Sequence, residues 1–403
     1  MITPDDLRRA AALLQGRIIR TPLVYSPGIS RMAGAHVYLK LENLQKTGAF
    51  KVRGATYKIL SNAGRVGPGG VVAASAGNHA QGVALAAREA GIPATIVMPE
   101  RVSLAKQAAT REYGAEIVLS GENLSESLEA AVRLAESRGA AFVHPFDDPE
   151  IILGQATIGQ EILEDLPETD LVIVPVGGGG LIAGIASAVR VLRPQTRVVG
   201  VQAAACPSAA LSCREGRRIP VDPERTIADG IAVSEVGGIT FPIMRDLVEE
   251  IVLVDEDQII EAMVLLLERK KVLAEGAGAA PLAALLGGSI AVPEGGNVVL
   301  VVSGGNIDPL VLDRVLRQGF LWNGRIMRFS VCLEDEPGSL VGLLALITRL
   351  RANVLDIHHA RHERGMPITA SRVDVELETR GHEHIAEITA ALTAAGYQVQ
   401  VRQ

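Results

Sequence analysis

Runs of consecutive apolar residues recur over the first three hundred residues, and segments of helical length separate them. We predict buried strands at residues 70–74, 94–98, 116–119, 171–174, 198–201 and 298–302, with helices between them at segments such as 80–90, 122–138 and 181–192. Continuous apolar strands that alternate with helices are typical of parallel sheets covered on both faces. In such α/β folds the functional groups collect in the loops that follow the carboxyl ends of the strands.

The pattern changes near Gly324. Residues 329–333 alternate between apolar and polar side chains, and an apolar stripe at helical spacing runs from Leu340 to Leu350. Strands at 353–359 and 368–378, a helix at 382–394 and a last strand at 397–402 complete the order βαββαβ, which is that of a ferredoxin-like unit. We therefore expect a first domain over residues 1–320, a linker at 321–327 and a second domain at 328–403.

The composition narrows the class of protein. A chain of 403 residues with 48% hydrophobic residues is long enough for two or three domains and excludes a mainly disordered protein. The net charge of −7 does not indicate a surface for nucleic acid or an anionic membrane. Because Cys206, Cys213 and Cys332 are too few and too scattered for a disulfide framework or a zinc site, we expect a reducing compartment, the cytoplasm.

Two segments bear on targeting. Residues 1–6 are typical of a helix start, with Thr3 as the cap and Pro4 in the first turn, and not of a signal peptide. Residues 171–189 carry no charge, which is nominally enough for a membrane span. Pro175 and four consecutive glycines interrupt them, however, so a strand, a turn and a helix are favoured and no membrane span is expected.

Two of four residue clusters carry side chains with candidate chemistry. In residues 47–55, Thr-Gly-Ala-Phe-Lys-Val-Arg-Gly-Ala, the apolar neighbours of Lys51 favour its neutral amine and make it a candidate nucleophile, although most lysines are solvated surface charges. Residues 75–82, Ser-Ala-Gly-Asn-His-Ala-Gln-Gly, follow a predicted strand and open a helix. This turn suits a small anion, and the alternative is a capped turn with a packed His79.

The other two clusters follow further predicted strands. Four glycines at 177–180 lie between a strand and a helix, where several N–H groups and the helix dipole favour a phosphate group. A nicotinamide dinucleotide would need an acidic residue after the next strand, which ends instead at Gln202, and no Walker lysine follows the glycines. The fourth cluster is Ser-Gly-Gly-Asn at 303–306.

Together with Glu-Gly-Ala-Gly-Ala at 275–279, these clusters resemble the motifs of fold-type II pyridoxal-phosphate enzymes. Residues 5–320 resemble the threonine and serine dehydratases, also called threonine ammonia-lyases, in the order and spacing of their motifs. The resemblance implies a tryptophan synthase β-like fold of two parallel-sheet α/β subdomains, the smaller at about residues 40–145 inserted in the larger. It also implies pyridoxal 5'-phosphate as the cofactor and an amino acid as the substrate.

The resemblance further implies a role for each site residue. Lys51 would hold the cofactor covalently and remove the Cα proton of the substrate. Phe50 would pack on the cofactor ring, Asn78 would contact its 3-hydroxyl and Ser303 its pyridine nitrogen. The phosphate would accept from the amides of Gly177, Gly178, Gly179, Gly180 and Leu181. The substrate carboxylate would be bound by Ser75, Asn78 and the amide of His79.

Two departures from the family pattern narrow the activity. Serine racemases carry a serine where Ala76 stands, and because alanine cannot act as an acid or base we expect racemisation to be minor. Several members bind a divalent ion through an acid after the strand 198–201, where this chain has Gln202, with Cys206 and Ser208 downstream. We therefore predict no tight divalent metal site, while a monovalent ion stays open.

The expected reaction is the conversion of L-threonine to 2-oxobutanoate and ammonia, with a side activity on L-serine. Serine or hydroxyaspartate dehydration is the alternative among enzymes, and a non-catalytic amino-acid sensor is the alternative from another class. Isoleucine biosynthesis and threonine catabolism both stay open as the pathway.

The C-terminal unit resembles an ACT domain through residues 335–340 and 353–357. Such domains pair and bind amino acids at their interfaces, which implies a homodimer or homotetramer and an effector such as isoleucine or valine at Gly338 and Asn353. A purely dimerising unit is the alternative. The histidine-containing run at 358–364 is interpreted as an exposed strand end and loop in preference to a metal site.

Overall fold

The computed structural model describes residues 2–361 and 366–402 and divides into two compact units, Met1–Ile307 and Asp308–Gln403. This division lies earlier than the expected boundary at residue 320, because helix α13 (Pro309–Trp322) groups with the second unit. The expected linker at 321–327 contains the end of α13, a turn and the start of β11 (Ile326–Glu334). Within the described ranges, no helix is long and apolar enough to cross a membrane.

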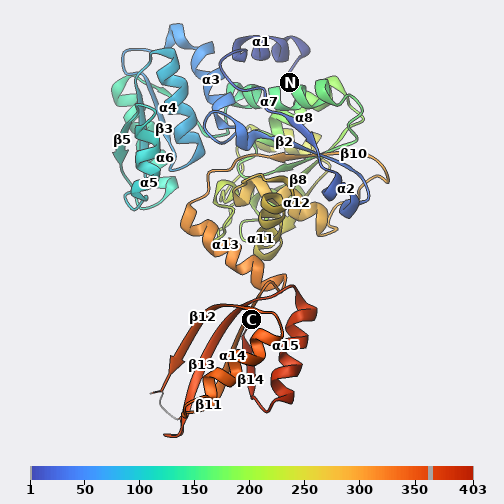
Figure 1. Ribbon diagram of the computed structural model, residues 1–403. Coiled ribbons are helices and arrows are strands. Elements are labelled where there is room, and N and C mark those ends of the chain that lie inside the picture. The colour runs from blue at the N-terminus through green and yellow to red at the C-terminus, as the bar shows by residue number, and fades with distance from the viewer. Residues whose placement is uncertain (1, 362–365, 403) are drawn as a thin grey trace. The chain divides into compact units, whose positions relative to one another are not determined.

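The first unit contains a larger sheet in the order β1-β2-β10-β7-β8-β9. All neighbouring strands are parallel except β1, which is antiparallel to β2. Figure 1 shows α7 and α8 on one face of this sheet and α11 and α12 on the other. The strands are β1 (Leu23–Tyr25), β2 (His36–Leu41), β7 (Leu171–Pro175), β8 (Arg197–Ala203), β9 (Glu250–Val254) and β10 (Asn297–Val302).

A smaller parallel sheet in the order β5-β4-β3-β6 lies in the part of the first unit that precedes β7. Its strands are β3 (Val71–Ala74), β4 (Ala94–Met98), β5 (Glu116–Leu119) and β6 (Ala141–Phe142). The helices of this region are α3 (Lys51–Ser61), α4 (Asn78–Ala90), α5 (Leu104–Arg111) and α6 (Leu124–Arg138). The α/β fold with parallel sheets that the apolar runs predict is confirmed.

The remaining elements of the first unit cover or connect the larger sheet. They are α1 (Pro4–Leu14), α2 (Pro27–Ala33), α7 (Pro149–Asp165), α8 (Gly180–Leu192), α9 (Ser208–Glu215), α10 (Thr240–Leu247), α11 (Glu256–Leu265) and α12 (Gly276–Leu286). Short 3-10 turns lie at η1 (Glu42–Leu44), η2 (Ala63–Arg65) and η3 (Asp229–Ile231), and a π-helical turn, η4 (Leu266–Lys270), follows α11.

Helices α3, α7 and α8 pack with their backbones in direct contact. A Cβ atom added to Gly154 of α7 would lie 2.6 Å from the Cα atom of Gly54 in α3. A Cβ atom added to Gly184 of α8 would lie 2.6 Å from the carbonyl oxygen of Ile152 in α7. Since atoms that close would overlap, glycine is required at both crossings.

The second unit is a four-stranded antiparallel sheet in the order β12-β13-β11-β14. After β11 come α14 (Ser339–Arg349), β12 (Asn353–Ala360), β13 (Ala370–Glu378), α15 (His382–Ala394) and β14 (Val399–Arg402), which confirms the predicted βαββαβ order. Phe329, Val375, Leu343 and Ile388 contribute to a single core between this sheet and the two helices. Within the run 358–364, Arg361 pairs with Asp335 at 3.0 Å, and residues 362–364 lie outside the described residues.

Candidate active site

The loops after three neighbouring strands of the larger sheet lie side by side. Strand β10 pairs in parallel with β2 on one side and with β7 on the other, so the carboxyl ends of all three face the same edge. Lys51 follows β2, Ser303 follows β10 and the glycines at 177–180 follow β7. Ligand sites of open α/β sheets lie at this edge.

Hydrogen bonds join these loops to one another. The amide of Phe50 donates to the carbonyl of Ser303 at 3.0 Å, and Ala49 bridges to Gly304. The side-chain nitrogen of Asn306 donates to the carbonyl of Thr47 at 2.7 Å. The first, second and fourth clusters therefore form one site, since Asn306 also donates to the side-chain oxygen of Asn78 at 2.8 Å.

Lys51 is the first residue of α3, and its amine is withdrawn from solvent. Its Nζ donates to the carbonyl of Pro145 at 2.8 Å and lies 5.2 Å from the centroid of the Phe50 ring. Burial lowers the pKa of the Lys51 amine to about 8, an effect that the charge of Glu275 partly opposes. A larger fraction of this amine is therefore neutral near neutral pH than for an exposed lysine, which suits a nucleophile or a base.

The glycine loop at 177–180 is built as an anion cradle. Gly179 has a φ of +95° at the N-cap of α8, and the first N–H groups of a helix have no partner within it. A Cβ atom at Gly178 would lie 2.4 Å from ring carbons of Phe146, so this chain passes directly over that ring. The carbonyl of Gly178 accepts from the Thr240 hydroxyl at 2.6 Å, which fixes the loop.

The side chain of His79 is packed in the interior of the first unit. It is 3% exposed, and its Nε2 donates to the carbonyl of Val143 at 3.0 Å. Burial and, to a smaller extent, the charge of Lys51 lower the pKa of His79 to about 3, so the ring is neutral. The backbone amide of His79, at the start of α4, is therefore the group of this residue that can serve a ligand. The buried Ser75 hydroxyl accepts a hydrogen bond from the amide of Gly77 in the turn before α4.

Sequence reasoning assigned no role to Glu275 or Phe146, which the structure places in the site. Glu275 is 6% exposed, and Asn78 donates to its carboxylate at 2.8 and 3.1 Å. Burial raises the pKa of Glu275 to about 7, although the hydrogen bond from Asn78 lowers it. An acid inside the Gly- and Ala-rich segment 274–280 is a sequence signal for such a buried carboxyl. Phe146 carries no comparable local signal.

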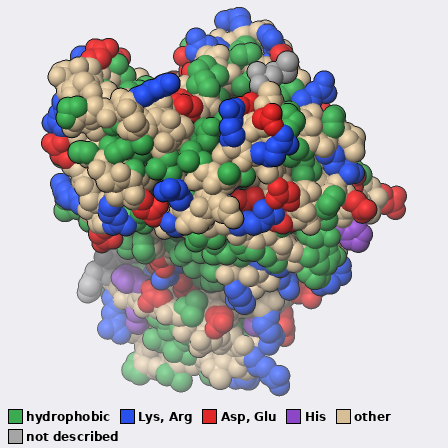
Figure 2. Space-filling view, turned by 90° about the horizontal axis from the view of Figure 1, so that it is seen from above, with side chains coloured by type: hydrophobic (Ala, Val, Ile, Leu, Met, Phe, Trp, Pro, Cys, Tyr) green, Lys and Arg blue, Asp and Glu red, His purple; other side chains and the backbone are tan. Residues whose placement is uncertain are grey.

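The features of this site fit a phosphorylated carbonyl compound such as pyridoxal phosphate. They are an amine of lowered pKa, an aromatic ring beside it, a buried hydroxyl at Ser303 and an anion cradle. On the face shown in Figure 2, Lys and Arg side chains lie interspersed with Asp and Glu, so this face has no large region of one charge. Recognition is therefore expected from local amides and hydroxyls.

Comparison with known proteins agrees with this chemistry. The sequence pattern of the pyridoxal-phosphate dependent enzymes matches residues 14–304, and the chain belongs to that family. It is 47% identical over 401 residues to the L-threonine ammonia-lyase of Thermotoga maritima, and this match covers 100% of both chains. The predicted enzyme class and cofactor are therefore confirmed.

Two solved structures resemble the chain over most of its length. The threonine deaminase of T.th. is 43% identical with a TM-score of 0.72, over 76% of this chain and 99% of that one. A serine racemase from maize is 37% identical with a TM-score of 0.74, over 78% of this chain and 98% of that one.

The two residues expected to bind an effector do not lie together within one chain. Gly338 precedes the first residue of α14, and Asn353 follows the other end of this helix. Eleven residues at about 1.5 Å each separate the two by more than 15 Å along the helix. Gly338 and Asn353 therefore lie far apart within a single second unit.

Proposed function

We propose that this chain is an L-threonine ammonia-lyase, which converts L-threonine to 2-oxobutanoate and ammonia. The Cα proton is removed, the β-hydroxyl leaves as water, and hydrolysis of the carbon–nitrogen bond takes up one water and releases ammonia. The observation that carries the proposal is the amine of Lys51, which is buried, has a pKa lowered to about 8 and lies beside the Phe50 ring. The full-length relative in Thermotoga maritima bears the same activity in its name.

Pyridoxal phosphate would supply an electron sink conjugated with the substrate Cα. Lys51 would hold it covalently, with Phe50 on its ring, Asn78 at its 3-hydroxyl and Ser303 at its pyridine nitrogen. The amides of residues 177–181 would bind its phosphate at the start of α8. Because the Ser303 hydroxyl is neutral, it does not hold the pyridine nitrogen protonated as a carboxylate would, which favours elimination over transamination.

The substrate would lie between α3 and the start of α4. Its carboxylate would accept from the Ser75 hydroxyl, the Asn78 side chain and the amide of His79, which begin and flank the first turn of α4. The Lys51 amine, when neutral, would then take the Cα proton. Ala76 offers no acid or base on the opposite side, so elimination is expected to exceed racemisation.

A steady-state comparison of L-threonine, L-serine and 3-hydroxyaspartate tests this proposal. We expect the highest kcat/KM with threonine, measured by release of 2-oxobutanoate and ammonia, and no turnover in the Lys51→Ala variant. A higher kcat/KM with serine or hydroxyaspartate would instead support one of those dehydratases. Retained turnover in Lys51→Ala would contradict the role of this lysine.

We further propose that the second unit regulates the enzyme by binding an amino acid such as isoleucine or valine. Gly338 has a φ of +103° with open space beside it, which allows close approach of a ligand, and Asn353 lies exposed at the start of β12. Since the two lie at opposite ends of α14, a shared site would take Gly338 from one copy and Asn353 from another, in a homodimer or homotetramer.

Three free cysteines fit the cytoplasm as the compartment.

A further inference from the structure

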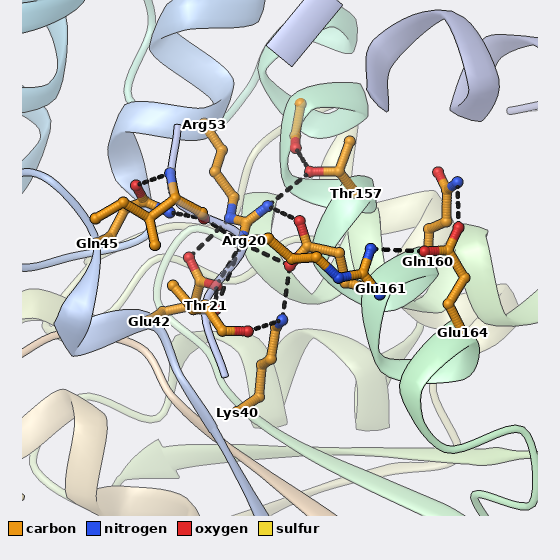
Figure 3. Close-up of polar contacts among 12 residues, drawn as sticks. Arg20, Thr21, Lys40, Glu42, Gln45, Arg53, Thr157, Gln160, Glu161 and Glu164 are labelled. Atoms are coloured by element: carbon orange, nitrogen blue, oxygen red, sulfur yellow. Dashed lines mark hydrogen bonds and ion pairs between the residues drawn. The ribbon is translucent and has the colours of Figure 1, made fainter. Parts of the chain in front are cut away.

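Four charged side chains meet inside the first unit, beneath the start of α3 (Figure 3). Lys40, Glu42 and Arg53 are fully buried, and Glu161 is 8% exposed. Two positive and two negative charges balance one another in this cluster. We call these four residues the buried ion cluster.

Arg53 is the centre of the buried ion cluster. Its Nε and Nη2 donate to the two carboxylate oxygens of Glu42 at 2.8 and 2.7 Å. Its Nη1 and Nη2 donate to Glu161 at 2.7 and 2.8 Å. Two bidentate pairs fix both the position and the plane of the guanidinium group, which a lysine ammonium cannot reproduce.

The other cation ties the cluster to the sheet. Lys40, on β2, donates from Nζ to Glu161 at 2.6 Å and to the carbonyl of Thr21 at 2.7 Å. The Thr21 hydroxyl donates in turn to Glu42. Strand β2, turn η1 and helices α3 and α7 are thereby joined through one set of hydrogen bonds.

The members of the cluster flank Lys51 in the chain or lie on the neighbouring helix. Lys40 and Glu42 precede this segment in the chain, Arg53 follows Lys51 by two residues, and Glu161 comes from the neighbouring helix α7. Residues two positions apart in a helix are separated by about 200° around its axis. Lys51 and Arg53 therefore point to opposite sides of α3. Arg53 thus anchors the back of the helix turn whose front presents the Lys51 amine.

Stability alone is a poor reason for these buried charges. Removing charged groups from water is costly, and apolar side chains of similar volume often give equal or greater stability. Directed bonds give what apolar packing does not, which is a defined position for each group. The close glycine contact between Gly54 of α3 and Gly154 of α7 works in the same sense, because it leaves no room for the helix to shift.

We propose that Arg53 is a positioning residue for Lys51, which acts through the buried ion cluster to hold the first turn of α3 and so the amine of Lys51 in its reactive place. This inference rests on the proposed function only in that Lys51 is taken as the reacting amine.

The test compares Arg53→Lys, Glu161→Gln and Val189→Ala in the full chain loaded with pyridoxal phosphate. Arg53→Lys keeps the positive charge and loses the two bidentate pairs of the guanidinium group. Glu161→Gln removes the charge of Glu161 and keeps the pair between Arg53 and Glu42. Val189→Ala is the matched control, because Val189 is buried near the last turn of α8 and far from the glycine end of that helix. The readouts are the melting temperature, kcat and KM for threonine, and the pH midpoint of the visible absorbance band of the bound cofactor.

We expect kcat of Arg53→Lys to fall about 10- to 100-fold with a smaller change in KM, as for a reacting group displaced by about 1 Å. The pH midpoint of the absorbance band should shift, and Glu161→Gln should show a smaller effect in the same direction. Val189→Ala should lower the melting temperature with kcat and the midpoint unchanged.

Wild-type kcat and an unshifted midpoint in both Arg53→Lys and Glu161→Gln would overturn the proposal and leave the cluster a purely structural role. Equal changes in Val189→Ala at a matched loss of melting temperature would overturn it as well. If Arg53→Lys does not fold, Glu161→Gln decides between these outcomes. The absorbance titration needs no substrate, so it judges the positioning role separately from the proposed threonine activity.

Discussion

The side-chain amide of Asn78 donates to both carboxylate oxygens of Glu275, from a position 197 residues earlier in the chain. An ionised carboxylate only accepts hydrogen bonds, so Glu275 turns the nitrogen of this amide toward itself. Asn306 donates to the amide oxygen from the other side. Two residues without an assigned role in the reaction thus set the orientation of one that we place at the cofactor.

Replacing Glu275 by Gln should remove a pH-dependent step in activity. Because burial raises the pKa of Glu275 to about 7, the wild-type site gains a negative charge as the pH rises through neutrality. We expect kcat/KM for threonine to change across this range in the wild type and to be flatter in Glu275→Gln. The exposed Glu122→Gln variant serves as the control and should keep the wild-type profile. A step near pH 7 that persists in Glu275→Gln would assign it to another group.

His79 should make the fold sensitive to acid. Burial lowers the pKa of His79 to about 3 from an ordinary value of 6.5, so the unfolded chain binds a proton in this window and the folded chain does not. Its contribution to stability is therefore fully present above about pH 6.5 and is lost as the pH falls toward 3, at up to about 1.4 kcal/mol per pH unit.

Urea unfolding of the wild type and His79→Gln at several pH values measures this contribution. Glu275 has the opposite effect between its ordinary pKa of 4.5 and its folded value of about 7, where its raised pKa makes stability fall as the pH rises. The difference between wild type and variant isolates His79, and the gap should narrow as the pH falls. A gap independent of pH would mean that the pKa of His79 is the same in the folded and the unfolded chain.

Gly178→Ala should weaken cofactor binding. The new Cβ atom would lie 2.4 Å from carbons of the Phe146 ring, so the loop must move away from the position in which its amides converge. A loss of one or two good hydrogen bonds to a phosphate corresponds to at least about tenfold in Kd. Titration of the apoprotein with pyridoxal phosphate, followed by absorbance, measures this change. Gly64→Ala is the control because nothing lies within 4 Å of its added Cβ, and its Kd should be that of the wild type.

Isoleucine or valine should bind the full-length enzyme outside the active site. We expect calorimetric heat from one of these amino acids in the wild type and in Lys51→Ala, and little heat in Asn353→Ala. Loss of the heat in Lys51→Ala would show binding at the active site instead. If neither amino acid gives heat with the wild type, the second unit does not bind these effectors.

The sequence predicts the other strands of the two parallel sheets and all four strands of the second unit, but it misses β1, β2, β6 and β9. Strand β2 contains Lys40, whose partner Glu161 lies 121 residues later and is not visible as a local pattern. Strand β6 has only two residues, too few for a pattern to show. The helix predicted at about 382–394 is confirmed as α15 (His382–Ala394).

For the site, sequence motifs identify residues whose role follows from their local position in the chain, such as Lys51 at a helix start and the glycines after β7. They do not identify partners brought in by tertiary packing, such as Phe146 beneath Gly178. Gly338 and Asn353 are a different case, because the helix that separates them is itself predicted from the apolar stripe at 340–350 and places them at opposite ends.

The glycine contacts between α3, α7 and α8 set a fixed length at the centre of the enzyme. Lys51 stands at the start of α3 and the phosphate cradle at the start of α8, and each helix approaches the backbone of α7 closely at a glycine. We therefore expect these contacts to hold the distance between the Lys51 amine and the cradle constant, so that the site suits a ligand of one length. A side chain at Gly154 or Gly184 would change this distance from outside the site. The cofactor would then be held less well at one end, although every reacting residue is still present.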